Sequence, residues 1–261
     1  MSASVVTTVI GGAKRVIGAP ALWLGCWVAL TAMAWVVGAQ VTFLVAAAVG
    51  PFDALELGRL VFGIADVLRV HPELVTGIAT AVLVGGLVSA IGWLLVSPVV
   101  IARLAGRREL RELGATALAG LPAIAVQSLW HAVLRAVLVA VVMMSAQPLP
   151  VWIVWVLAGV VWLAAGVALD ATRVAVVEAD AAPWHIKTAW RGFVRVAKRP
   201  RVLVPGVLLG ALQVVVSAAI VWLALRGLGS GTVWGARALA LVSVGLGLWR
   251  VGIVVEDAKA E

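Results

Sequence analysis

The amino-acid sequence predicts an all-α, polytopic transmembrane helix bundle with six spans. Of the 261 residues, 64% are hydrophobic and only 12% are charged, which is about half the charged share of an ordinary soluble domain. The apolar residues lie in long runs without charge, and about twenty such residues suffice to cross a bilayer. The lysines and arginines gather in alternate connecting segments, as the positive-inside rule describes.

The charge-free runs set the bounds of the predicted spans. They lie at about 21–47, 75–100, 115–143, 151–169, 203–225 and 233–253, within a single transmembrane domain that covers 1–261. With the N-terminus inside, the inner segments hold most of the lysines and arginines, whereas the outer ones hold only Arg59, Arg69 and Arg226. The sequence therefore predicts that both termini are cytoplasmic.

Two further segments are predicted to be amphipathic helices at the membrane surface, at about 53–71 and 184–198. The second is the clearer one, because it carries an apolar stripe opposite a basic face. The stripe is Ile186, Ala189, Trp190, Phe193, Val194 and Ala197, and the basic face is Lys187, Arg191, Arg195 and Lys198. We expect the basic face to contact anionic lipid or a cytoplasmic partner; an interfacial connector without further function is the alternative.

Three ionisable residues fall inside predicted spans near the outer boundary. His131 and Arg135 are four residues apart on the third span and share a face, and Arg237 lies at similar depth on the sixth. Such groups usually face protein or water. We therefore predict an outward-facing polar pocket for an anion or a lipid headgroup, with snorkelling or a structural ion pair as the alternative.

A second charged group marks the predicted cytoplasmic end of the fourth span. Asp170 and Arg173 are one helical turn apart and can pair, and Glu178 follows on the same segment. Arg250, at the end of the sixth span, is a further candidate partner. We interpret these four residues as structural charge pairs; a membrane enzyme that uses Asp170 and Glu178 in acid–base chemistry is the less favoured hypothesis.

Other site chemistries find little support in the sequence. The single cysteine and the three histidines form no metal-ligand pattern, so neither a metal nor a cofactor is expected. No phosphate-binding loop or nucleophile elbow occurs. The net charge of +8 is better explained by topology than by nucleic acid. Small residues at four-residue spacing, such as Gly206 and Gly210, favour close helix packing and leave homo-oligomerisation open.

Two pairs of segments hint at internal repetition. AKRVIGAPALWLG at 13–25 is similar to AKRPRVLVPGVLLG at 197–210, and RVAVVEAD at 173–180 is similar to RVGIVVED at 250–257. Three stacked helical hairpins would produce this pattern, and chance similarity in a biased composition is the rival explanation. A true repeat predicts that Arg173 and Arg250 lie at the same membrane depth.

The stretch from Asp170 to Pro200 carries a family resemblance. A span that ends in DATRVAVVEAD, followed by a basic amphipathic helix that ends in AKRP, resembles a group of uncharacterised six-helix bacterial membrane proteins, some of them related to the membrane domain of glycerophosphodiester phosphodiesterases. The resemblance implies a helix bundle in a bacterial inner (cytoplasmic) membrane. It implies no catalytic residue, because the soluble phosphodiesterase domain does not occur in this chain.

The sequence thus favours a non-enzymatic integral membrane protein that acts as an accessory, a scaffold or a lipid-interacting bundle. The alternative is a small transporter or lipid-handling protein built around His131, Arg135 and Arg237. The two hypotheses differ in where the arginines lie. A transporter needs them to converge along a hydrated path, whereas a scaffold places them at the headgroup level.

Overall fold

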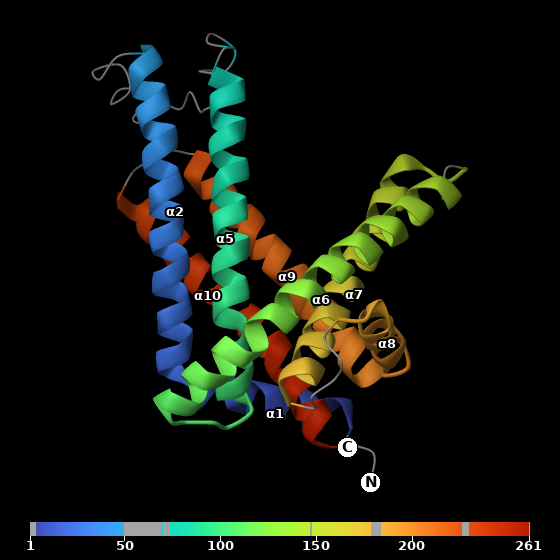
Figure 1. Ribbon diagram of the computed structural model, residues 1–261. Helices are drawn as coiled ribbons and strands as arrows, with labels where there is room; N and C mark the ends of the chain where they lie inside the picture. Colours follow the sequence, from blue (N-terminus) through green and yellow to red (C-terminus); the bar gives the residue numbers. More distant parts are fainter. Residues whose placement is uncertain are drawn as a thin grey trace. The chain divides into compact units, whose positions relative to one another are not determined.

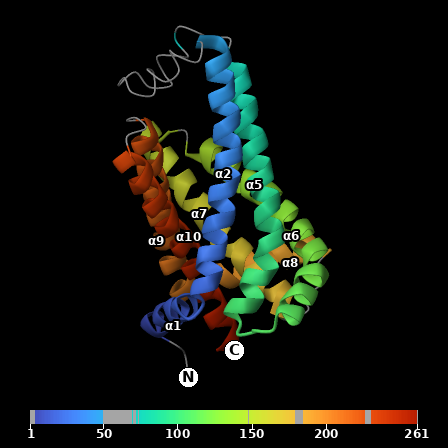
Figure 2. The ribbon, with the colours of Figure 1, turned by 90° about the vertical axis from the view of Figure 1, so that its left-hand side faces the viewer.

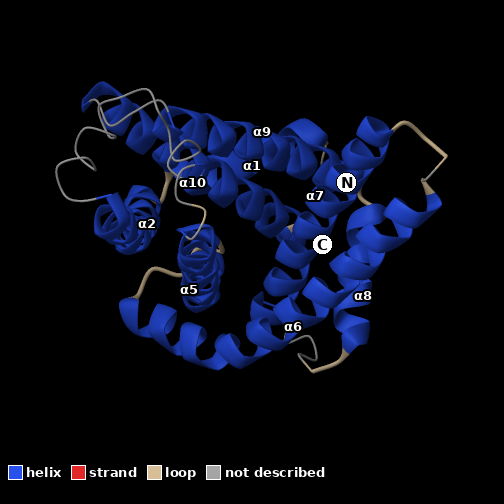
Figure 3. Cartoon of the chain, turned by 90° about the horizontal axis from the view of Figure 1, so that it is seen from above, coloured by secondary structure: helices blue, strands red, loops and turns tan. Residues whose placement is uncertain are grey.

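The computed structural model describes residues 4–49, 69, 72, 74–146, 148–178, 184–225 and 230–260. Over these residues the regular structure is helical, without strands (Figure 3). Five helices are long and apolar enough to cross a membrane, and a sixth is gained if the first two helices form one broken span. The predicted all-α membrane bundle is confirmed. The amphipathic helix predicted at 53–71 lies, except for Arg69, outside the described residues.

Eight helices are described, and their bounds differ from the predicted spans (Figure 1). They are α1 (Val5–Ile17), α2 (Pro20–Val49), α5 (Leu74–Leu104), α6 (Leu110–Ser145), α7 (Val151–Glu178), α8 (Ile186–Ala197), α9 (Pro200–Leu225) and α10 (Ser230–Lys259). The long helices extend beyond the spans because the predictions stopped where charged residues begin. The α7 helix instead continues through Asp170 and Arg173, since these side chains find partners within the fold.

The chain forms two compact units. Unit 1 consists of Met1–Leu22, Leu94–Gln213 and Gly245–Glu261, and unit 2 of Trp23–Trp93 and Val214–Val244. Unit 1 thus contains α1, α6, α7, α8, the first half of α9, the last third of α5 and the second half of α10. Its two terminal segments lie close together (Figures 1 and 2).

The core of unit 1 is formed by large aliphatic side chains from several helices. Ile101, Leu104, Ile124, Leu248 and Ile253 are each at most 2% exposed. The α6, α7 and α8 helices pack against one another around this core, and α9 packs on α7. A Cβ atom on Gly206 would lie 2.7 Å from Val167, and one on Gly210 would lie 3.0 Å from Leu163. This pair of small residues therefore serves helix packing within the chain.

Unit 2 contains most of α2, the first two thirds of α5 and the beginning of α10. The α2 and α5 helices run side by side (Figures 1 and 2), and Gly92 on α5 leaves room for the Met33 side chain of α2. Two indole groups connect α2 to α10. The Nε1 atom of Trp23 donates to the Leu241 carbonyl at 2.8 Å, and that of Trp27 donates to the Arg237 carbonyl at 3.2 Å. These bonds satisfy the indole N–H groups inside an apolar unit.

The α1 helix, which the sequence analysis did not predict, matches α8 in sequence and position. In both segments a threonine, a glycine, a valine and a proline follow one another at intervals of four residues. They are Thr8, Gly12, Val16 and Pro20 in the first segment and Thr188, Gly192, Val196 and Pro200 in the second. In both helices the first three of these residues are buried, and in both the proline starts the long helix that follows, a position that suits its missing N–H.

The two glycines of this pattern perform the same task. A Cβ atom on Gly12 would lie 2.7 Å from the Ile253 backbone nitrogen of α10, and one on Gly192 would collide with the Thr172 hydroxyl of α7. Each short helix thus packs through glycine on the second half of a long helix. The internal repeat gains support from this geometry, but its register differs from the one proposed from the sequence, which aligned Lys14 with Lys198.

Candidate functional site: an arginine cluster around Asp170

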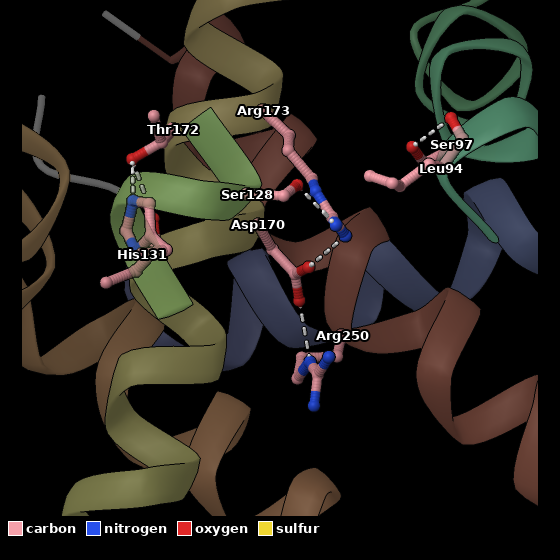
Figure 4. Close-up of polar contacts among 9 residues, drawn as sticks. Leu94, Ser97, Ser128, His131, Asp170, Thr172, Arg173 and Arg250 are labelled. Carbon is pink, nitrogen blue, oxygen red and sulfur yellow. Dashed lines mark hydrogen bonds and ion pairs between the residues drawn. The ribbon is translucent and has the colours of Figure 1, made fainter. Parts of the chain in front are cut away.

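Asp170 is the centre of a charged cluster inside unit 1. Its side chain is 4% exposed and accepts a hydrogen bond from Arg250 Nε at 2.7 Å. Arg173, one helical turn further along α7, places NH1 at 4.0 Å from the other carboxylate oxygen. Figure 4 shows the carboxylate between the two guanidinium groups. A carboxylate buried to this extent is stable only when such partners offset its desolvation.

Arg173 is itself almost fully buried, at 7% exposure. Its NH2 group donates to Ser128 Oγ on α6 at 2.9 Å, so the residue connects α6 with α7 (Figure 4). Its Nε atom is also buried, and no described residue accepts a hydrogen bond from it. A buried N–H group without an acceptor costs about 1–3 kcal/mol, so this donor is unusual in a well-packed region.

Arg135 on α6 adds a third guanidinium group at the same level. Its CZ atom lies 4.3 Å from the centre of the Trp162 ring, a cation–π contact. A Cβ atom on Gly166 would lie 3.3 Å from Arg135 NH2 and 3.8 Å from Arg250 NH1. The two guanidinium groups therefore flank the same glycine on α7. The Arg135 Nε atom, like that of Arg173, is buried without an acceptor among the described residues.

The cluster carries an excess of positive charge. Arg173 and Arg250 pair with the single carboxylate of Asp170, and Arg135 lies beside Arg250 at Gly166. Guanidinium groups stay protonated at any physiological pH. The other paired carboxylates of the described chain are engaged elsewhere, with Glu178 on Arg107 at 3.3 Å, Glu256 on Arg15 at 2.6 Å and Asp257 on Arg199 at 2.6 Å. The local sum is thus +2 in a unit whose surroundings are mainly aliphatic.

His131 belongs to a neighbouring, uncharged contact between three helices. Thr172 Oγ1 donates to the Ala168 carbonyl at 3.0 Å, so its oxygen accepts from His131 Nε2 at 2.8 Å (Figure 4). The imidazole also stacks on Phe193 of α8, with 4.9 Å between ring centroids and 19° between planes. These contacts assign the Nε2–H tautomer, and they indicate that His131 holds α6, α7 and α8 together.

The structure brings together residues that the sequence placed near opposite membrane boundaries. The sequence placed His131 and Arg135 near the outer boundary and Asp170 near the inner one, whereas His131 contacts Thr172 and Arg135 flanks Gly166. The physical reason is the length of α6, which has 36 residues and exceeds the ~20 that a straight span needs. His131 consequently lies mid-helix, beside the second half of α7.

The remaining predicted site residues occupy other places. Arg237 belongs to unit 2, where its CZ atom lies 5.1 Å from the centre of the Trp234 ring. Glu178 pairs with Arg107, and its position eight residues after Asp170 separates the two carboxylates by about 12 Å along the helix. That separation, and the arginine partner of each carboxylate, argue against a shared role in acid–base chemistry.

The α8 helix has three faces, and not the two that the sequence predicted. Thr188, Ala189, Gly192 and Val196 are buried against the bundle. Of the predicted apolar stripe, Ile186 and Trp190 are 42% and 54% exposed, so this edge points away from the protein. The basic residues Lys187, Arg191 and Lys198 are exposed on the third face. The buried face was missed because Thr188 and Gly192 do not register as apolar, yet small residues permit the closest packing.

Sequence reasoning missed a second charged cluster at the ends of α9 and α10. Asp257 accepts hydrogen bonds from Arg199 NH1 at 2.6 Å and from Arg201 Nε at 2.7 Å. Arg195 lines a small pocket beside this group. Burial and the positive charge of Arg199 lower the pKa of Arg195, and Asp257 opposes that shift. The similarity of RVGIVVED to RVAVVEAD was the only sequence feature that pointed to this carboxylate.

Among the described residues, no group of three histidine, cysteine, aspartate or glutamate side chains is arranged to hold a metal ion. Comparisons with protein-family models, curated proteins and solved structures return no match. The resemblance noted in the sequence thus stays a prediction.

Proposed function

We propose that this protein is a non-enzymatic, lipid-interacting bundle of a bacterial inner membrane, with both termini cytoplasmic, and that α8 is its contact with anionic lipid. The observation that carries the proposal is the three-sided character of α8. One face packs on α7 and α6, one edge is apolar and exposed, and the remaining face is basic.

An amphipathic helix at a membrane surface needs both an exposed apolar edge and an exposed basic face. Trp184, Ile186 and Trp190 are 62%, 42% and 54% exposed, and indole rings favour the headgroup level of a bilayer. Lys187, Arg191 and Lys198 are exposed beside them, where each contributes about 1 kcal/mol of attraction to an anionic leaflet. The helix would thus lie in the interface, with its apolar edge in lipid and its basic face toward phosphate groups.

The match between α1 and α8 supports the proposed orientation. Both short helices precede a long helix that begins with proline, and both pack through glycine on a long helix of unit 1. In the six-span topology the segments that contain them fall on the same side of the membrane. The charge asymmetry assigns that side to the cytoplasm.

The proposal is tested by the lipids that stay with the protein. The wild type, reconstituted in mixed phosphatidylcholine and phosphatidylglycerol and then extracted, should retain anionic lipid preferentially in native mass spectrometry. Substitution of Lys187, Arg191 and Lys198 by glutamine should reduce that preference several-fold, and the charge-conserving K187R/K198R variant should keep it. Equal retention in the glutamine variant and the wild type would refute the assignment of α8.

A second candidate, a small transporter or lipid-handling protein, is favoured by one observation. Arg173 and Arg250 pair with a buried carboxylate inside unit 1 and Arg135 lies beside them at Gly166, whereas a scaffold has no need for such a cluster. This candidate predicts that proteoliposomes release a trapped anion faster with the wild type than with a variant of Arg135. Equal release would leave the lipid-contact proposal as the better explanation.

A further inference from the structure

We infer that Arg135 and Arg250 form a binding site for a phosphate group at Gly166 of α7. This proposal is independent of the lipid contact assigned to α8, because it rests on different residues. The ligand chemistry is a phosphomonoester or inorganic phosphate, whose charge of about −1.5 to −2 near neutral pH matches the local excess of +2. Free phosphate and the headgroup of phosphatidic acid are two sources of that chemistry.

The absence of a side chain at Gly166 lets two guanidinium groups approach the same point of α7. The position that its Cβ atom would take lies 3.3 Å from Arg135 NH2 and 3.8 Å from Arg250 NH1. These two terminal nitrogens are therefore close enough for one phosphate group to bridge them through charge-assisted hydrogen bonds of about 2.7–2.9 Å. Gly210 on α9 also lets Arg250 approach, since its Cβ position lies 3.6 Å from the same Arg250 nitrogen.

Unsatisfied donors point to the same conclusion. The Nε atoms of Arg135 and Arg173 are buried without an acceptor among the described residues, and the Arg173 side chain is 8% exposed. Asp170 engages Arg250 through Nε and Arg173 through NH1. One carboxylate cannot satisfy three forked guanidinium groups, each of which offers five N–H donors. An oxyanion beside Arg135 and Arg250 would supply the missing negative charge and would accept from their terminal N–H groups.

The two proposed ligand-binding side chains are the less buried members of the cluster. The Arg250 side chain is 21% exposed and Arg135 is half-buried, whereas Asp170 and Arg173 are enclosed. Arg135 and Arg250 therefore form the outer edge of the cluster, and the Asp170–Arg173 pair forms its floor. In this arrangement Asp170 is a positioning residue that holds the Arg250 fork through Nε and leaves its two terminal nitrogens available to a ligand.

The site is tested by crowding the two guanidinium groups without removing any charge. The G166A variant adds a methyl group that faces Arg135 NH2 and Arg250 NH1, and G159A is the matched control, because a Cβ atom on Gly159 of the same helix meets nothing within 4 Å. Binding of radiolabelled inorganic phosphate to the detergent-purified full chain should be saturable and about tenfold weaker in G166A, and G159A should equal the wild type. R250K, which keeps the charge but loses the fork, should also weaken binding.

The lipid source is examined in parallel with nanodiscs that contain phosphatidic acid or phosphatidylglycerol. If phosphatidic acid is retained and free phosphate does not compete, the ligand is the lipid headgroup; if free phosphate binds alone, the ligand is the soluble anion. The proposal is overturned if neither is bound, if acetate binds as tightly as phosphate, or if G166A and G159A bind equally. Circular dichroism and thermal melting confirm that each variant is folded.

Discussion

Replacement of Asp170 by asparagine is the sharpest test of the charged cluster. The substitution keeps the shape of the side chain, but it removes the negative charge that faces Arg173 and Arg250, and the local sum rises from +2 to +3. Arg250 Nε donates to the carboxylate at 2.7 Å, and the two side chains are 21% and 4% exposed. Loss of one partner from a buried ion pair costs about 3–5 kcal/mol. A single charge pair at 4 Å and an effective dielectric constant of about 20 gives about 4 kcal/mol.

The free energy of unfolding of D170N should therefore fall by about 3–5 kcal/mol. It is measured by titration from mild detergent into sodium dodecyl sulfate, with helical circular dichroism as the readout. Glu112→Gln is the matched control, since Glu112 is an exposed carboxylate on α6, and its effect should stay within about 0.5 kcal/mol. In a double-mutant cycle, R250Q and D170N should couple by at least about 1 kcal/mol. The argument that this pair offsets buried charge would be refuted if D170N lost less free energy of unfolding than the Glu112→Gln control. Additive effects of D170N and R250Q in the double variant would also refute it.

Three further predictions follow from contacts within unit 1 and from the topology. Gly192→Ala should separate α8 from α7, because its Cβ would collide with the Thr172 hydroxyl. The free energy of unfolding should fall by about 1–3 kcal/mol. In the same titration G159A, whose Cβ meets no neighbour, should be at least as stable as the wild type. Thr172→Val should lower the free energy of unfolding by about 1–3 kcal/mol, since His131 Nε2 loses its 2.8 Å partner. A melting curve equal to that of the wild type would show that the bond contributes nothing. A reporter fused after Ala146 should be active only as a periplasmic enzyme, and cytoplasmic activity would invert the proposed orientation.

Much of the architecture could be predicted because hydropathy and charge act locally along the chain. An apolar run of sufficient length must form a helix in lipid, where every backbone N–H and C=O group needs a partner within the segment. The helix ends were harder to predict. The α7 helix continues to Glu178, because Asp170 and Arg173 are neutralised by contacts that no local pattern reveals. The α1 helix was missed because its buried face consists of Thr8, Gly12 and Val16, and two of these three residues, Thr8 and Gly12, contribute little hydropathy.

The sequence by itself determined which residues could carry a site, and the tertiary structure decided how they combine. His131 and Arg135 were predicted as one group with Arg237, and Asp170, Arg173, Glu178 and Arg250 as another, from spacing within a span and from the similar ends of two spans. The structure pairs Arg250 with Asp170 across 80 residues of sequence, and it brings His131 to Thr172 across 41, a contact that no local pattern indicated. The physical reason is that helical periodicity fixes which face of a helix a side chain occupies, whereas the partner of that face depends on how small residues such as Gly166 and Gly192 let whole helices approach.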